Sequence, residues 1–182
     1  LQRNHWRDSY STLEVKWNTP IMHRCCVLVQ IEEFCVLFRM PCNLAVFHIN
    51  GAEGIQEQLP EIKHWYIGGH SLGGAMADTY AAGHASELDG LILLAAYSTQ
   101  DLSDSGLAVL SMYGSQDGAL DMVKYEQHHV NPPENAAEVV IDGGCHAGFG
   151  CYGAQEENGV PSISGNQQII ITAEEITRMM NL

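Results

Sequence analysis

The amino-acid sequence predicts an α/β fold in which a mostly parallel sheet carries helices on both faces. Short apolar runs alternate along the chain with segments of helical period, as expected when parallel strands are joined by crossover helices. The run GLILLAA at residues 90–96 contains no polar residue, which is typical of a strand buried on both faces. With 182 residues the chain can bury one sizeable core, so we expect residues 1–182 to form a single domain.

The N-terminal segments have the weakest pattern. Residues 13–17 (LEVKW) alternate and predict one strand, while residues 25–31 (CCVLVQI) and 34–40 (FCVLFRM) are short apolar runs. The second of these runs stops at Pro41 and predicts a buried strand. The sequence therefore indicates the N-terminal strands of the sheet only incompletely.

The pattern becomes clearer from residue 43 onward. Residues 43–59 have apolar side chains at helical spacing and predict a helix that is broken near Gly51 and Gly54. HWYIGG at residues 64–69 predicts a strand. The Ala-rich segment 71–86 predicts a helix whose small residues allow close packing against a sheet.

The second half of the chain continues the same alternation. Apolar runs predict three further strands, at residues 90–97 (GLILLAAY), 107–114 (LAVLSMYG) and 137–144 (AEVVIDGG). Helical periodicity predicts a helix at residues 121–129 and a last one at about residues 167–180.

Composition and charge exclude several classes of partner. The net charge of −14 argues against binding to nucleic acid, because proteins that bind phosphate backbones do so mainly through Lys and Arg. No apolar run approaches the roughly 20 residues that a membrane-spanning helix needs, which favours a soluble, cytoplasmic protein. These observations give no indication of the oligomeric state.

Cysteine and histidine spacing predicts neither a disulfide framework nor a metal site. The six cysteines lie mainly in apolar, strand-like segments without paired spacing and are interpreted as reduced core residues. Cys145, His146 and Cys151 lie near one another, but zinc sites usually have four ligands at closer, paired spacing. We therefore expect no metal and no cofactor.

The motif that carries chemistry is Gly69-His70-Ser71-Leu72-Gly73. It follows a predicted strand directly and precedes a predicted helix, as in the nucleophile turn of serine hydrolases. Glycines at positions 69 and 73 are expected to leave room for this turn. The Leu72 N–H would then point from the helix N-terminus at a developing oxyanion. The alternative, an ordinary N-cap serine, is disfavoured by the glycines and by the residues that follow downstream.

An acid and a base follow in the expected order. Asp117 lies in a turn directly after the strand at 107–114, and His146 lies in a Gly-rich turn after the strand at 137–144. Catalytic groups gather at the carboxyl ends of strands in such sheets, so both could reach Ser71. Asp101 is a rival acid, and Asp117 could instead be an ordinary turn aspartate.

The other histidines are weaker candidates for the base. His128 and His129 lie in a polar helix with no strand before them, and His84 lies near a helix end. His70 is interpreted as a packing residue of the turn.

These residues resemble the α/β-hydrolase superfamily, and most closely a group of small bacterial hydrolases. The matching stretches are MPCNLAVFHINGA, HWYIGGHSLGGAMA, DGLILLAAYST, YGSQDG and GGCHAGFGCYG, which together span roughly residues 35–182. The resemblance implies the α/β-hydrolase fold with Ser71, Asp117 and His146 as the catalytic triad. It also implies a Gly-rich turn upstream that donates a second oxyanion N–H, yet no HGG- or PGG-like turn precedes Gly51. Relatives of this kind can carry an N-terminal membrane anchor, so the resemblance leaves an extracytoplasmic location open beside the cytoplasmic one.

The expected activity is hydrolysis of an ester or similar acyl bond of a small substrate through an acyl-enzyme. Two alternatives stay open. The chain could be a binding protein that keeps the hydrolase fold after losing its oxyanion loop. It could also be an acyltransferase, if an alcohol or amine rather than water captures the acyl-enzyme.

Overall fold

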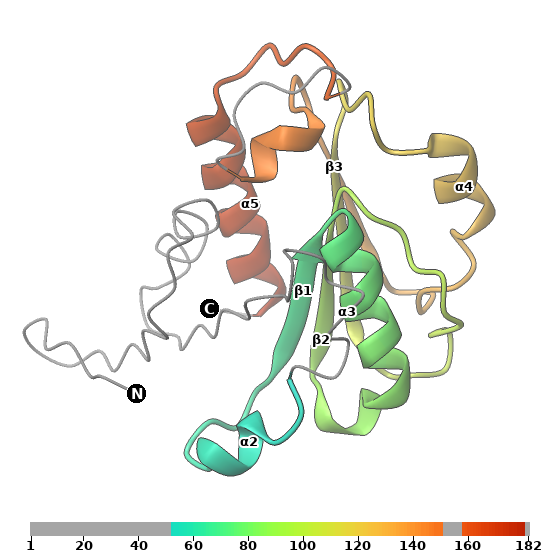
Figure 1. The fold of residues 1–182 in the computed structure, drawn as a ribbon, viewed down its shortest axis with the longest axis vertical. Coiled ribbons are helices and arrows are strands. Elements are labelled where there is room, and N and C mark those ends of the chain that lie inside the picture. Colours follow the sequence, from blue (N-terminus) through green and yellow to red (C-terminus); the bar gives the residue numbers. More distant parts are fainter. Residues whose placement is uncertain (1–51, 151–157, 181–182) are drawn as a thin grey trace, which may run out of the picture.

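The described part of the chain is built on four parallel strands. The computed structural model describes residues 52–150 and 158–180, and its strands lie side by side in the order in which they occur in the sequence (Figure 1). They are β1 (Tyr66–His70), β2 (Gly90–Leu94), β3 (Ala108–Gly114) and β4 (Ala137–Ile141). The predicted parallel α/β arrangement is confirmed. The strands expected at 13–17, 25–31 and 34–40 lie outside the described residues.

Strand β2 is the most deeply buried of the four, because every one of its residues is buried. It pairs with β1 on one side and β3 on the other, with Leu94 in register with His70 and Met112. The strand ends three residues before the predicted position. The reason is Ala95, whose φ of 49° turns the backbone out of the extended conformation.

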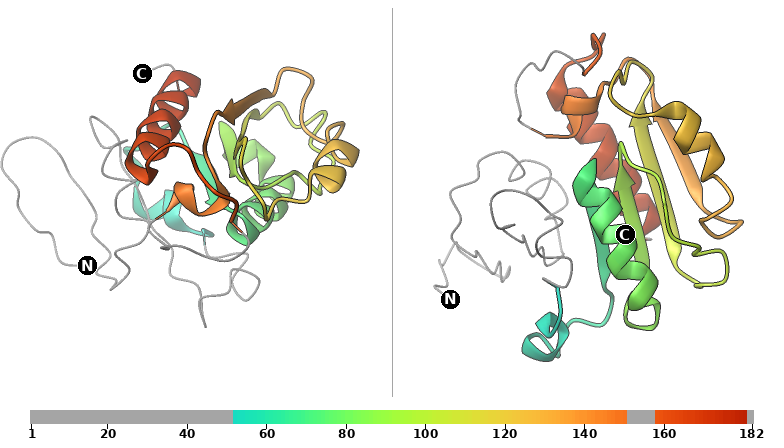
Figure 2. Two further views of the ribbon diagram at one scale, coloured as in Figure 1. Left: turned by 90° about the horizontal axis from the view of Figure 1, so that it is seen from above. Right: turned by 45° about the vertical axis from the view of Figure 1, so that its right-hand side comes forward.

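Helices cover both faces of this sheet. Helix α3 (Leu72–Gly83) packs on one face and α5 (Gly165–Met179) on the other, as the two views of Figure 2 show. Side chains alternate along each strand, so each face has its own core. The core under α3 consists of Ala77, Ala81, Leu91, Leu93, Ala96, Leu102, Leu107 and Val109. The core under α5 consists of Ile92, Leu94, Ala95, Leu110, Met112, Ile141, Phe149 and Ile176.

The shorter helical segments differ in part from the prediction. The helix expected at 43–59 is represented among the described residues by α2 (Ile55–Gln58). Within residues 52–150 and 158–180, helix α4 (Met122–Gln127) and two short 3₁₀ segments, η3 (Ala85–Glu87) and η4 (His146–Phe149), are the remaining elements. Helix α5 begins two residues before its predicted start, because Ser164 and Gln167 form a capping box that satisfies its first backbone N–H groups.

A buried carboxylate ties α3 to the segment after β2. Asp78 is fully buried in α3, and its carboxylate accepts hydrogen bonds from the Ser98 hydroxyl and from the backbone N–H groups of Thr99 and Gln100. These bonds compensate the cost of burying the charge. The loop that follows β2 is therefore fixed against the helix that follows β1.

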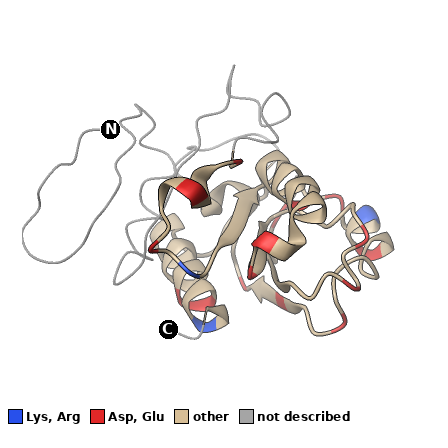
Figure 3. Ribbon diagram, turned by 90° about the horizontal axis from the view of Figure 1, so that it is seen from below, with Lys and Arg blue, Asp and Glu red and all other residues tan. Residues whose placement is uncertain are grey.

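Positive side chains are sparse over the described surface. Lys63 lies in the loop before β1, Lys124 in α4 and Arg178 in α5, while the acidic residues are spread along the described ribbon (Figure 3). In the described ranges, no helix combines the length and the apolar character that crossing a membrane requires.

Candidate active site

The turn between β1 and α3 holds Ser71 in an unusual backbone conformation. Its φ of 53° and ψ of −122° differ from the β-region geometry of an ordinary N-cap serine, and its hydroxyl makes no capping hydrogen bond. Such a conformation costs of order 1–3 kcal/mol and persists only where its surroundings impose it. Here the Ser71 N–H donates to the Leu94 carbonyl of β2 at 2.8 Å, and the Ala75 N–H donates to the Ser71 carbonyl at 3.1 Å.

Two glycines make room for this turn, but they are not both the predicted ones. A Cβ on Gly69 would lie 2.4 Å from the Gly73 carbonyl carbon, so Gly69 is required as expected. A Cβ on Gly73 would meet nothing within 4 Å. The second tight position is Gly74, where a Cβ would lie 2.6 Å from the Ala96 Cβ and 2.8 Å from the Gly69 carbonyl oxygen. The prediction that residue 73 must be a glycine to make room is therefore wrong. The backbone of residue 73 is crowded by residue 69, but a side chain on residue 73 would enter open space.

The start of α3 supplies hydrogen-bond donors beside Ser71. The first N–H groups of a helix have no partner within the helix, and Leu72 is the first residue of α3. The Leu72 side chain, next to Ser71 in the chain, is 45% exposed. The turn thus combines a hydroxyl, the first N–H groups of a helix and an exposed apolar side chain.

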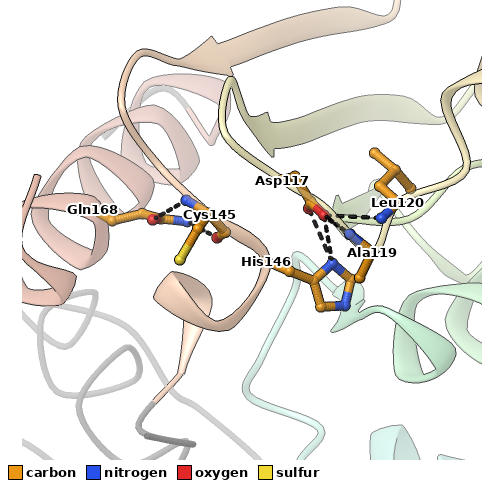
Figure 4. A network of polar contacts seen from close by, with 6 residues as sticks. All are labelled: Asp117, Ala119, Leu120, Cys145, His146 and Gln168. Atoms are coloured by element: carbon orange, nitrogen blue, oxygen red, sulfur yellow. Dashed lines mark hydrogen bonds and ion pairs between the residues drawn. The ribbon is translucent and has the colours of Figure 1, made fainter. Parts of the chain in front are cut away.

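Asp117 and His146 meet at the carboxyl ends of β3 and β4. The His146 Nδ1 lies 2.9 Å from Asp117 Oδ2 and 3.1 Å from Oδ1 (Figure 4). The Asp117 side chain is only 1% exposed and that of His146 12%. The backbone N–H groups of Ala119 and Leu120 also donate to Asp117 Oδ1, at 2.9 and 2.8 Å. The carboxylate is thus fixed by three donors.

These donors also stabilise the ionised form of Asp117. Burial by itself disfavours the ionised carboxyl, but the hydrogen bonds from His146, Leu120 and Ala119 outweigh it and hold the pKa of Asp117 below its ordinary value. With its Nδ1 facing a carboxylate, His146 carries a proton on that nitrogen, which leaves Nε2 as the acceptor in the neutral ring.

A ring contact with His70 places His146 next to the Ser71 turn. The ring of His70, the residue before Ser71, lies 4.6 Å from the His146 ring and 5.8 Å from the Phe149 ring, measured between centroids. Burial, with a smaller contribution from His146, lowers the pKa of His70 to about 4. No hydrogen bond among the described residues joins the Ser71 hydroxyl to His146. Catalytic hydrogen bonds are often long without substrate and shorten in the reacting complex.

The rival residues lie elsewhere. Asp101 is exposed and accepts hydrogen bonds from the backbone and hydroxyl of Ser103. His84 stacks on Tyr80, and His128 stacks on Tyr97. His129 lies at the surface, 3.8 Å from Glu138. Of the carboxylates and histidines considered from the sequence, the structure brings together Asp117 and His146.

One supporting residue was missed by sequence reasoning. The side-chain amide of Gln168 in α5 is buried and pairs with both backbone groups of Cys145, the residue before His146 (Figure 4). No local signal marks it, since it is one of two adjacent glutamines at the polar start of a helix. Cys145 itself is buried, and Cys151 lies outside the described residues. No group of three potential metal ligands occurs in residues 52–150 and 158–180.

Comparison with known proteins places the chain in a family. A model described as "Alpha/beta hydrolase family" matches residues 25–170. No curated protein matches the chain. Among solved structures, Est1E from Butyrivibrio proteoclasticus superposes with a TM-score of 0.58 at 12% identity, covering 88% of this chain and 81% of that one.

A second solved structure shows the same level of similarity. It is a protein of unknown function from Agrobacterium tumefaciens, provisionally classed as an alpha/beta hydrolase, with a TM-score of 0.58 and 13% identity. The match covers 87% of this chain and 76% of that one. At such low identities these two likenesses show the fold alone.

Proposed function

Because the chain belongs to the alpha/beta hydrolase family, we propose that it is a serine hydrolase in which Ser71 is the nucleophile, His146 the base and Asp117 the acid. The observation that carries the proposal is the Asp117–His146 pair, held at the carboxyl edge of the sheet beside the strained Ser71 turn. Nucleophile, acid and base occur along the chain in the order Ser, Asp, His, which is typical of this fold.

The proposed reaction begins when the Ser71 hydroxyl attacks the carbonyl carbon of an ester. His146 Nε2 takes the hydroxyl proton as the new C–O bond forms, and the Asp117 carboxylate stabilises the resulting imidazolium. Collapse of the tetrahedral intermediate breaks the ester bond, and the imidazolium gives its proton to the leaving alcohol. Water then attacks the acyl-enzyme by the same steps and releases the acid.

The negative charge of the tetrahedral intermediate requires fixed donors. The Leu72 N–H at the start of α3 is the proposed oxyanion donor, aided by the positive end of the helix dipole. Losing one such donor costs about 10²- to 10³-fold in rate. The family supplies a second donor from a Gly-rich turn upstream of β1, and no HGG- or PGG-like turn precedes Gly51 in this sequence.

A small ester-like molecule is the proposed substrate class. The exposed Leu72 side chain supplies an apolar surface adjacent to Ser71, which suits an acyl or alkyl group rather than a charged one. The acyl-transfer chemistry itself needs only the side chains and backbone groups named above, so no cofactor or metal is invoked.

Labelling with a fluorophosphonate probe tests the assignment directly. The wild type should gain one adduct by intact mass, and both Ser71→Ala and His146→Ala should lose it. Ser103→Ala, which removes an exposed hydroxyl bonded to Asp101, is the matched control and should label like the wild type.

Other results would point to a different function. A wild type that gains no adduct, or an adduct that persists in Ser71→Ala, would contradict the proposal, and the first of these would favour a binding protein with the hydrolase fold. Ester exchange that exceeds hydrolysis when an alcohol is added would instead identify an acyltransferase.

A further inference from the structure

The loop that carries His146 is held by a side chain of α5, which follows it in the chain. Gln168 lies in the first turn of α5 and is 1% exposed. The Cys145 N–H donates to its Oε1 at 3.0 Å, and its Nε2 donates to the Cys145 carbonyl at 2.9 Å (Figure 4). The amide thus pairs with a single residue through both backbone groups, as a neighbouring strand would.

The loop is shaped to receive this amide. A Cβ on Gly148 would lie 1.8 Å from Gln168 Oε1 and 2.8 Å from Nε2. A Cβ on Gly144 would lie 3.0 Å from the same Oε1. Residues on both sides of His146 therefore lack side chains where the amide of Gln168 sits. Burying an amide is costly unless its hydrogen bonds are made, and here donor and acceptor are both used.

The contact acts on the backbone that orients His146. The Cys145 carbonyl belongs to the peptide bond that joins Cys145 to His146, so fixing it fixes the plane from which the imidazole side chain projects. The N–H of that same peptide donates to the Asn158 carbonyl at 3.2 Å. With the backbone held in this way, the His146 ring keeps its Nδ1 on Asp117.

We propose that Gln168 is a positioning residue for the reaction, which aligns the His146 imidazole between Asp117 and Ser71 by holding the Cys145 backbone. The inference rests on the proposed function, because it assigns the reason for holding His146. Gln168 has no place in the chemical steps and touches no reacting atom. Its loss should therefore lower the rate of the chemical step and leave substrate binding nearly unchanged.

The expected effect follows from the geometry that proton transfer needs. A misplacement of about 1 Å in a catalytic group can cost about 10²-fold in rate. Gln168→Met keeps the length of the side chain and removes both hydrogen bonds. We expect it to lower kcat by about 10- to 100-fold on 4-nitrophenyl acetate, with KM changed by less than about 3-fold.

A second variant removes the same contact without changing residue 168. Gly148→Ala places a methyl group where the amide lies, and the flexible end of Gln168 must move away. It should lower kcat to a similar extent. Ile176→Val is the control: it trims a buried side chain of the same helix and lowers the melting temperature. It should leave kcat within about 2-fold, because it leaves both hydrogen bonds between Gln168 and the Cys145 backbone in place.

A spectroscopic readout separates this role from general destabilisation. The His146 Nδ1 proton, hydrogen-bonded to Asp117, should give a downfield proton resonance in the wild type that disappears or shifts in Gln168→Met and Gly148→Ala but not in Ile176→Val. Unchanged kcat and an unchanged resonance in both loop variants would overturn the inference. So would an equal loss of kcat in Ile176→Val.

The two proposals can fail separately. If the wild type neither hydrolyses the ester nor takes up the fluorophosphonate probe, the proposed function fails. The resonance then decides the role of Gln168: its persistence in Gln168→Met overturns the positioning role, and its loss supports it.

Discussion

The two halves of the candidate site are built in different ways. The Ser71 turn is made by the contiguous residues 69–74, and close backbone contacts between Gly69, Gly73 and Gly74 shape it, with Leu94 and Ala96 as neighbours from β2 and the residues just after it. The Asp117–His146 pair joins residues 29 positions apart, and its loops are held by Asn158 and Gln168 from still further along the chain. The first half is therefore shaped mainly by residues adjacent in the chain, whereas the second depends on contacts between distant segments.

The largest effect should come from removing the nucleophile, and it also tests the strain in the turn. Ser71→Ala and Ser71→Gly should each lower kcat by at least about 10⁴-fold. Glycine adopts positive φ without a steric penalty, so Ser71→Gly should be more stable than Ser71→Ala by about 1 kcal/mol. Denaturant unfolding compares the two. Equal stabilities would mean that the backbone of this turn is not strained.

Asp117→Asn should have the next largest effect, in the half that depends on tertiary contacts. The amide favours the wrong histidine tautomer, so kcat should fall by about 10⁴-fold. Steady-state rates on an ester test this, with Asp101→Asn as the exposed control that should stay within about 2-fold. A full rate in Asp117→Asn would remove Asp117 from the proposed triad.

The lowered pKa of Asp117 predicts a pH dependence of the free energy of unfolding, which the same variant can test. The pKa of Asp117 is lower in the folded protein than in the unfolded chain, so its ionised form stabilises the fold above the unfolded value of about 4. That contribution is lost as the pH falls through the lower folded pKa. The stability gap between the wild type and Asp117→Asn should therefore shrink as the pH falls below about 5, as urea unfolding at several pH values would measure.

The glycines give a smaller and sharper test of the local half. Gly74→Ala should destabilise the protein by about 1–3 kcal/mol, because its Cβ would overlap both Ala96 and the Gly69 carbonyl. Gly73→Ala should be neutral or stabilising by up to about 1 kcal/mol, because its Cβ enters open space within a helix. Thermal unfolding should give a lower melting temperature for Gly74→Ala than for Gly73→Ala. The reverse order would contradict the described packing of the turn.

The smallest effect is expected where the two strand-end loops meet. The Ser115 hydroxyl accepts a hydrogen bond from the Gly143 N–H at 2.8 Å and lies 3.3 Å from the Asp142 carboxylate. Ser115→Ala should cost about 1 kcal/mol and change the hydrolysis rate by less than about 3-fold. A rate loss near that of Gln168→Met would show that this contact, too, orients His146.

The difference between the two halves explains what the sequence could predict. The Ser71 turn was predictable because its glycines and its strand and helix neighbours are adjacent in the chain, although the crowding of Gly74 in place of Gly73 required three-dimensional distances. Asp117 and His146 could be selected because each lies in a turn shortly after a predicted strand, three residues after Gly114 and five after Ile141. Their pairing in the structure agrees with that choice, while their catalytic roles stay predictions.

The supporting contacts were beyond sequence reasoning. Gln168 and Asp78 are polar residues in helices, where the expected environment is solvent, and only the packing of α3 and α5 buries them. His70 was interpreted as a packing residue of the turn, and its ring contact with His146 depends on how two distant loops meet. Such long-range contacts leave no periodic signal in a single sequence.

The position of α5 has a consequence for protein synthesis. The strands pair in the order in which they are made, so a growing chain can add each new strand to the previous one. The apolar face of β2 and β3 that carries Leu94 and Met112, however, is covered by α5, which follows all of them. A ribosome-bound chain that ends before residue 165 would expose this face, and we expect it to depend on chaperones until the last helix emerges.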